Sequence, residues 1–98
     1  MMLQERVAQL CDAVPGMTKA SAVMFISLWD ARGRTLTYGR LAEDASANSP
    51  DSTTEDAMRS TIQRLRRIIA DAALPVSILT RYDIGYRMVR LDPAWTWE

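Results

Sequence analysis

Apolar residues recur at helical spacing near the start of the chain. They are Leu3, Val7, Leu10 and Val14. Their spacing of i, i+4, i+7 and i+11 places them on one face of an amphipathic helix. Because Pro15 and Gly16 follow directly and are typical of a helix end, we predict a first helix that stops there.

A second helix is predicted from Thr18, a suitable N-cap, to about Ala31, where Arg32-Gly33-Arg34 supplies a glycine and positive charge. Its main apolar face consists of Ala22, Phe25, Leu28 and Trp29. Val23 and Ile26 lie off that face, and a helix that is apolar on several sides is usually covered on several sides. We expect the first helix to cover them, in the same chain or across a dimer.

The second half of the chain predicts two more helices and a hairpin. Leu36 is expected in a short strand, and Thr37 can cap a third helix that ends near Ala45. A polar loop follows and ends in Ser52-Thr53-Thr54-Glu55, a capping box that starts a long fourth helix. The apolar stripe of this helix is Met58, Ile62, Leu65 and Ile69, and Pro75 ends the helix.

Val76–Thr80 and Gly85–Arg90 are expected to form two short strands joined by a turn. The predicted fold class is therefore mainly α with a small β-hairpin (α+β). The chain has 98 residues, of which 48% are hydrophobic and 24% are charged, and this length and composition are typical of a single domain. We divide this domain into an N-terminal helix at 1–16, a core at 18–91 and a tail at 92–98.

Composition limits the location and the chemistry of the protein. The longest apolar runs are too short to span a bilayer, and Glu5 stands where a secretory signal would be basic, so we expect a cytoplasmic protein. The chain has no histidine, and Cys11 is its only cysteine. The acidic pairs Glu43-Asp44 and Glu55-Asp56 are better explained as solvated surface or helix-dipole partners. We expect no enzyme activity, no catalytic residue, no cofactor and no metal.

A net positive charge is confined to one half of the chain. The formal net charge is zero, which by itself argues against a generic nucleic-acid binder. Between Ala57 and Leu91, however, there are seven arginines and two acidic residues. Arginine presents a planar fork that suits phosphate, although a GC-rich genome would also enrich it. The position of the arginines is therefore the stronger indication.

The order of the elements favours DNA binding, because two helices followed by a β-hairpin form the winged helix-turn-helix. One stripe of the fourth helix carries Ser60, Gln63, Arg64 and Arg67, flanked by Arg59 and Arg66. A solvated face generally mixes both signs of charge, whereas Arg59–Ala70 contains four arginines and no acid. A polyanionic partner explains this face better than solvent exposure alone.

Two blocks, Met58–Ile69 and Ile78–Met88, are similar to the effector domains of OmpR/PhoB-type response regulators. In that family a helix with an Ile-x-x-Leu-Arg pattern precedes a wing that ends in Gly-Tyr-Arg. The resemblance covers about 18–91. It implies a bacterial, sequence-specific transcriptional regulator whose recognition helix enters the major groove of double-stranded DNA while the wing approaches the adjacent minor groove.

The resemblance also assigns single positions. Arg66 and Arg67 match basic residues that hold phosphates in that family, Thr61 and Arg64 match groove-facing positions, and Gly85-Tyr86-Arg87 matches the second strand of the wing. Together with the exposed stripe, the candidate DNA-binding residues are Arg59, Ser60, Thr61, Gln63, Arg64, Arg66, Arg67, Arg81, Tyr82 and Arg87.

The chain departs from the family pattern in several places. Arg59 stands where an acidic residue is common, Tyr82 occupies the usual position of the wing arginine with Arg81 one position earlier, and Asp83 replaces a glycine. Contact between the wing and DNA is therefore left open. We expect no receiver domain to regulate this chain, and we expect the first helix to stand in place of the family's four-stranded sheet.

A protein-interaction module without DNA binding is the alternative function, because one fold serves several functions. The indoles of Trp95 and Trp97 can anchor in a partner, or they can fold back on the domain. A homodimer through Leu3, Val7 and Leu10, or through the two tryptophans, would add specificity, and head-to-tail binding to direct repeats is the other arrangement. Transcription machinery is a further candidate partner.

Overall fold

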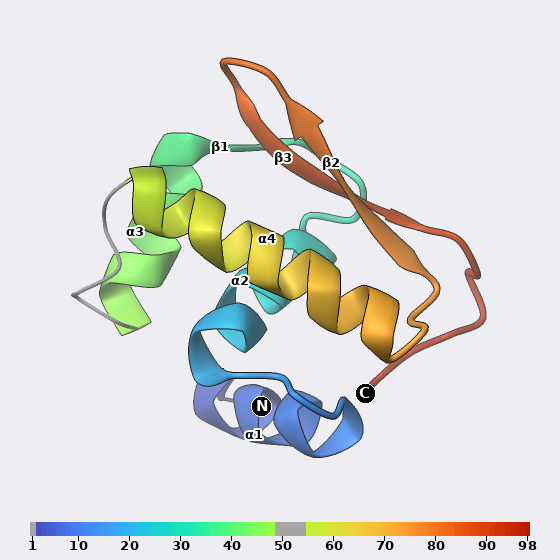
Figure 1. Ribbon diagram of the computed structural model, residues 1–98. Coiled ribbons are helices and arrows are strands. Elements are labelled where there is room, and N and C mark those ends of the chain that lie inside the picture. The colour runs from blue at the N-terminus through green and yellow to red at the C-terminus, as the bar shows by residue number, and fades with distance from the viewer. Residues whose placement is uncertain (1, 49–54) are drawn as a thin grey trace.

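The computed structural model describes residues 2–48 and 55–98, which form four helices and a three-stranded antiparallel sheet (Figure 1). The elements in chain order are α1 (Leu3–Ala13), α2 (Lys19–Asp30), β1 (Leu36–Thr37), α3 (Tyr38–Asn48), α4 (Glu55–Asp71), β2 (Val76–Arg81) and β3 (Gly85–Arg90). The predicted α+β class is confirmed. Most of the predicted capping box, Ser52–Thr54, lies outside the described residues.

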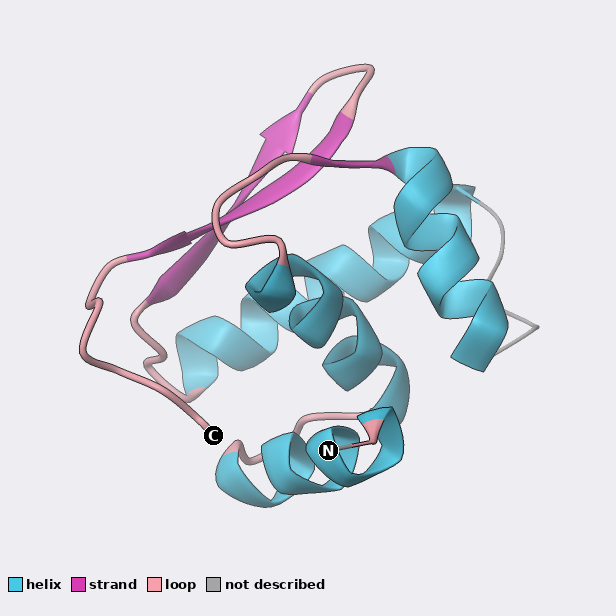
Figure 2. Cartoon of the chain, turned by 180° about the vertical axis from the view of Figure 1, so that it is seen from behind, coloured by secondary structure: helices cyan, strands magenta, loops and turns pink. Residues whose placement is uncertain are grey.

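The central element is α2, which packs against α1, α3, α4 and β3. Eight of its twelve residues are buried, and this is why the helix is apolar on almost every side. Figure 1 shows the sheet on one side of α2 and α4, with α1 on the other side. The opposite view keeps that order and shows the C-terminal residues returning towards α1 (Figure 2).

The predicted cover over the second apolar face of α2 is confirmed within a single chain. Val23 is 6% exposed and Ile26 is 2% exposed. Leu3 at the start of α1 lines the same small cavity as these two residues. The predicted cap is also present, because the backbone N–H of Ser21 donates to the Thr18 hydroxyl oxygen over 3.2 Å.

The sheet has the order β1-β3-β2, with β3 in the middle. In its register, Leu36 lies opposite Tyr86 and Thr37 lies opposite Gly85. A Cβ atom at Gly85 would overlap the backbone carbonyl of Leu36, so the close approach of β1 requires a glycine at this position. The same junction is closed by the N–H of Tyr38, which donates to the carbonyl of Ile84 over 3.1 Å.

Helix α4 ends at Asp71, before the predicted breaker Pro75. Ala73 adopts a φ of 53°, in the left-handed region. The N–H of Leu74 then donates to the carbonyl of Ile69 over 3.0 Å, as in a Schellman-type helix end. This left-handed residue turns the chain, and β2 begins directly after Pro75.

The C-terminal tail folds back on the core. Trp97 is 5% exposed, and its ring centroid lies 6.4 Å from that of Phe25 and 6.2 Å from that of Trp29. Of the two alternatives for the tail, the structure therefore places Trp97 inside its own chain. Among the described residues, no helix combines the length and apolar composition needed to cross a membrane.

Candidate nucleic-acid interface

Helix α4 has one buried face and one exposed face. Its buried residues are Met58, Ile62, Leu65, Ile68 and Ile69. Its exposed candidate residues are Arg59, Ser60, Gln63, Arg64 and Arg67. Because both sets keep helical spacing, the second set forms one continuous polar stripe along the outer side of the helix, which we call the α4 stripe.

Two arginines of the α4 stripe, Arg64 and Arg67, are exposed. Within the described residues, neither Arg64 nor Arg67 forms an ion pair. The two nearest carboxylates in sequence, Asp56 and Asp71, lie close to the two ends of the helix. The middle of the stripe therefore presents uncompensated positive charge together with the amide of Gln63, which is both a donor and an acceptor.

Thr61 is half-buried, and its hydroxyl is used within the helix. Its Oγ1 donates to the carbonyl of Ala57 over 2.9 Å. A threonine inside a helix commonly forms such a hydrogen bond to the carbonyl four residues earlier. The structure thus places Thr61 at the edge of the α4 stripe, with its donor already satisfied.

Arg66 lies between α4 and the hairpin. Its Nε and Nη2 donate to the carbonyl of Ile78 over 3.2 and 2.9 Å, and Nη2 also donates to Thr80 Oγ1 over 2.8 Å. The guanidinium carbon lies 6.0 Å from the centre of the Tyr86 ring. Arg66 therefore fixes β2 relative to α4.

The sequence does contain a signal for this inward position. Arg66 follows Ile62 by four residues and precedes Ile69 by three, so it borders the apolar stripe of the helix. Its neighbour Arg67 does not border that stripe and is exposed. Two adjacent arginines of similar appearance in the sequence therefore have different surroundings.

Arg81 and Tyr82 lie at the tip of the hairpin, which projects away from the helices in Figure 1. Tyr82 is 85% exposed. Asp83 takes the left-handed conformation, with a φ of 63°, and the N–H of Ile84 donates to the carbonyl of Arg81 over 3.0 Å. The turn is therefore tight, and it holds both candidate side chains in solvent.

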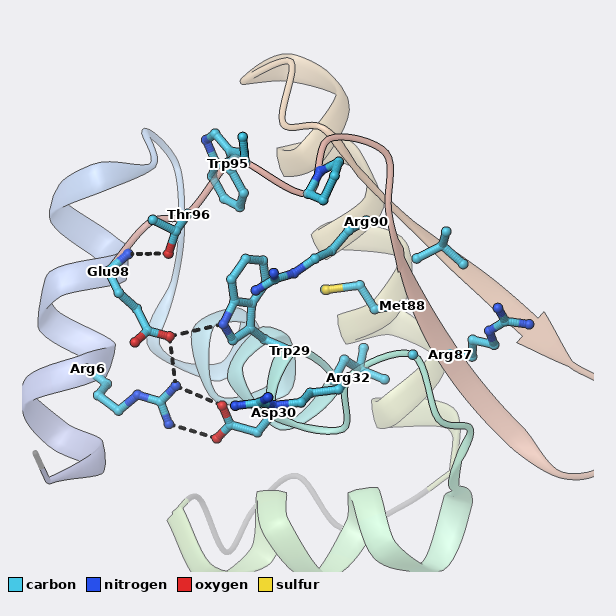
Figure 3. Close-up of a pocket in the computed structure, with 15 residues that line it drawn as sticks. Arg6, Trp29, Asp30, Arg32, Arg87, Met88, Arg90, Trp95, Thr96 and Glu98 are labelled. Atoms are coloured by element: carbon cyan, nitrogen blue, oxygen red, sulfur yellow. Dashed lines mark hydrogen bonds and ion pairs between the residues drawn. The ribbon is translucent and has the colours of Figure 1, made fainter.

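Arg87 lies on the other face of the hairpin from Tyr86 and Met88, opposite Leu79 in the strand register. It is half-buried, and its Nε is a buried donor without a hydrogen-bond partner among the described residues. In Figure 3 its side chain extends away from Trp29. The structure does not bring Arg87 together with the α4 stripe.

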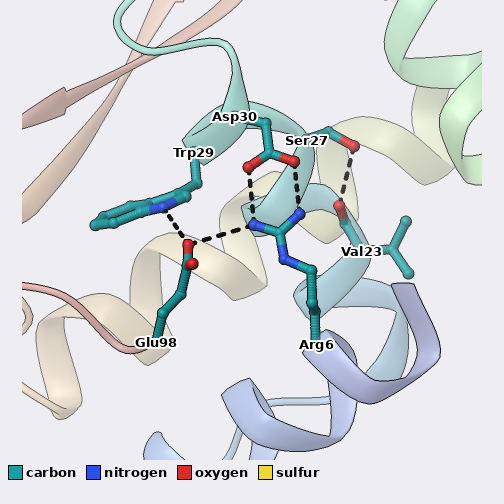
Figure 4. Close-up of polar contacts among 6 residues, drawn as sticks. All are labelled: Arg6, Val23, Ser27, Trp29, Asp30 and Glu98. Atoms are coloured by element: carbon teal, nitrogen blue, oxygen red, sulfur yellow. Dashed lines mark hydrogen bonds and ion pairs between the residues drawn. The ribbon is translucent and has the colours of Figure 1, made fainter. Parts of the chain in front are cut away.

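A polar cluster joins α1, α2 and the tail, and no sequence motif indicated it. Arg6 donates to both carboxylate oxygens of Asp30, over 2.7 and 2.8 Å, and lies 3.4 Å from Glu98 Oε1 (Figure 4). The same Glu98 oxygen accepts a hydrogen bond from Trp29 Nε1 over 3.0 Å. The hydrogen bond to Asp30 raises the pKa of Arg6, although partial burial acts in the opposite direction.

These partners are far apart in the chain, so no local pattern could have revealed the cluster. No group of residues able to hold a metal ion occurs in the ranges 2–48 and 55–98. No protein-family model matches the sequence, and the comparisons with curated proteins and with solved structures gave no match.

Proposed function

We propose that the chain is a winged helix-turn-helix protein that binds double-stranded DNA, with α4 in the major groove. The observation that carries this proposal is the α4 stripe, where Arg64 and Arg67 are exposed and unpaired within the described residues and Gln63 lies beside them on the same face of the helix. A long helix is about as wide as the major groove of B-DNA, roughly 12 Å. Long donors along its outer face can therefore reach base edges.

The chemistry of the α4 stripe fits the two tasks of such a helix. Arginine donates two parallel hydrogen bonds to guanine, and glutamine pairs with adenine in the same bidentate way, so Arg64 and Gln63 would read bases. Arg67 is one turn further along the helix and would contact phosphate. Arg66 has its donors engaged with β2 and would act by positioning the hairpin.

The surrounding elements support the same proposal. Helix α3 precedes α4, and the hairpin of β2 and β3 follows it, as in the winged version of the motif. Arg81 and Tyr82 at the hairpin tip would approach the neighbouring groove or its phosphates. The resemblance of the two sequence blocks to OmpR/PhoB-type effector domains points in the same direction.

The test is selection of bound duplexes from a random pool near physiological salt, followed by affinity measurements on the selected duplex as salt is varied. We expect log affinity to fall with log salt by about 0.9 per phosphate neutralised. Arg64→Ala should weaken binding about tenfold or more and relax specificity at one base pair. Arg67→Ala should weaken all duplexes alike and reduce the salt slope by about one.

Lys19→Ala is the matched control, because it removes one exposed positive charge at the start of α2, outside α4 and the hairpin. It should leave the affinity for the selected duplex unchanged. The proposal is rejected if no salt-dependent duplex binding is found, or if Arg64→Ala and Arg67→Ala bind as the unmodified chain does.

A protein-interaction module is the second candidate function. The hairpin exposes three large apolar side chains, Leu79, Tyr82 and Ile84. Exposed apolar side chains that gather on one element are typical of contact surfaces for other proteins. This function is favoured over DNA binding if the Tyr82→Ala variant no longer binds a protein partner of the unmodified chain, and if duplex binding is absent or does not depend on salt.

A further inference from the structure

A pocket of about 720 Å³ lies on a part of the molecule to which α4 contributes no described residue (Figure 3). Its walls come from the end of α2, from β3, from the tail and from Arg6 of α1. The charged side chains of its lining include three arginines, Arg6, Arg32 and Arg90, and two carboxylates, so the lining carries an excess of positive charge. This pocket is separate from the α4 stripe.

The two carboxylates of the pocket are already engaged within the chain. Asp30 accepts both hydrogen bonds of its pair with Arg6, and Glu98 accepts hydrogen bonds from Arg6 and from Trp29 Nε1. Figure 4 shows the side chains of Asp30, Glu98 and Trp29 with their hydrogen bonds to one another and to Arg6. The charge of Arg6 is therefore compensated by the chain itself, and the oxygens of both acids already accept hydrogen bonds within the same network.

Arg32 and Arg90 are different, because neither forms an ion pair in the described part of the chain. The guanidinium carbon of Arg90 lies only 3.6 Å from the centre of the Trp29 ring. At this distance the planar guanidinium stacks on the indole, and its N–H donors remain at its rim. The indole thus orders an arginine whose hydrogen-bonding edge has no acidic partner.

The backbone around Arg32 is fixed by hydrogen bonds. Arg32 adopts a φ of 52°, its N–H donates to the carbonyl of Trp29 over 3.2 Å, and the N–H of Arg34 donates to Ala31 over 3.1 Å. These bonds fix the turn after α2. Arg32, which lies in this turn, lines the same pocket.

We propose that this pocket binds a small organic oxyanion, with its carboxylate or phosphate oxygens paired to Arg32 and Arg90. Arginine forks recognise both kinds of oxygen group through paired hydrogen bonds. Met88, Pro93 and Trp95 line the remaining wall and supply apolar surface for the body of the ligand. The ligand would thereby connect the turn after α2 with β3.

Binding can be tested on the free protein without any DNA. Titrations with benzoate and with inorganic phosphate, at constant ionic strength, are followed by the indole N–H signals of the three tryptophans in two-dimensional NMR spectra. We expect saturable shifts of the Trp29 and Trp95 signals with at least one probe. Benzoate alone identifies a carboxylate ligand with an apolar body, and phosphate alone identifies a phosphate ligand. Benzamide, which has the same ring without charge, should give no saturable shift.

Arg32→Ala is the decisive variant, because Arg32 is exposed and makes no side-chain bond in the described residues. We expect it to weaken the bound probe tenfold or more while the protein remains folded. Lys19→Ala removes one charge elsewhere and should keep the original affinity. The inference is overturned if neither probe saturates, or if Arg32→Ala and Lys19→Ala bind the probe equally well. Because no duplex is present, either result leaves the proposed DNA binding to be decided by its own test.

Discussion

Apolar residues pack against both sides of α2, but the polar contacts that accompany this packing differ between the two sides. Towards α4 and the sheet the contacts are apolar, and Arg66 adds hydrogen bonds to neutral oxygens of β2. Towards α1 and the tail, Arg6 is bound to the carboxylates of Asp30 and Glu98. Positive charge is thus neutralised where the tail closes on α1, and it remains uncompensated on Arg64 and Arg67. The surroundings of an arginine, and not the number of arginines, indicate where an anionic partner would bind.

The largest expected loss of stability comes from a substitution at Gly85, where β1 pairs with β3. Gly85→Ala places a methyl group against the Leu36 carbonyl, so β1 must move away from β3 or the hairpin must bend. We expect the free energy of unfolding to fall by about 3 kcal/mol or more, measured by urea denaturation.

Gly39→Ala is the control for this substitution. Gly39 lies in α3, and a Cβ atom there would meet open space. Because alanine has a higher helix propensity than glycine, the free energy of unfolding should stay the same or rise by up to about 1 kcal/mol. An equal loss in both variants would contradict the role assigned to the close approach at Gly85.

A second prediction compares the adjacent residues Arg66 and Arg67. Arg66→Ala removes three hydrogen bonds and leaves the Ile78 carbonyl without that donor, so we expect a loss of about 2 kcal/mol of stability. Arg67→Ala changes an exposed residue and should stay within about 0.5 kcal/mol. Thermal and urea unfolding check both values, and similar losses in the two variants would refute the inward role of Arg66.

A third prediction uses salt to distinguish the two sides of α2. The Arg6 side chain is 20% exposed, while Asp30 is 52% exposed, so their pair is partly screened by solvent. Arg6→Ala should lower stability by about 1 kcal/mol at low salt, and by clearly less in 1 M salt.

The effect of Arg66→Ala should change little with salt, because its partners are neutral. Arg40→Ala breaks an exposed pair with Asp44 at 3.4 Å and serves as the control, with an expected loss of about 0.3 kcal/mol. A salt-independent Arg6→Ala would show that packing, rather than charge, joins α1 to the rest of the chain.

The smallest expected effect concerns the end of α4. Ala73 adopts a left-handed φ, which glycine tolerates better than alanine. Ala73→Gly should therefore stabilise the protein by about 0.5–1 kcal/mol at constant m-value in urea unfolding. A destabilised variant would indicate that the methyl group of Ala73 contributes to packing near Leu74.

Local features of the fold were predictable from sequence. The apolar stripe of α1, the Thr18 cap and the two strands of the hairpin each depend on residues only a few positions apart. Spacing and cap chemistry are read directly from such short segments. The same reasoning identified Val23 and Ile26 as residues that α1 would cover.

Long-range features were not predictable in the same way. The pairing of β1 with β3 and the contact of Arg6 with Glu98 join opposite parts of the sequence, and no periodicity encodes them. The inward turn of Arg66 was encoded, because this residue borders the apolar stripe, but its charge suggested a phosphate ligand. A long arginine can cover apolar surface with its stem while its head finds carbonyl oxygens.

The strand order also bears on how the molecule folds. β2 and β3 are joined by a short turn, and a hairpin of this kind forms within about 1–10 μs. β1 joins the same β3 across about 50 residues, a loop closure that becomes favourable only after the helices between them have packed. We therefore expect the edge next to Gly85 to gain protection from hydrogen exchange later than the β2 edge during refolding.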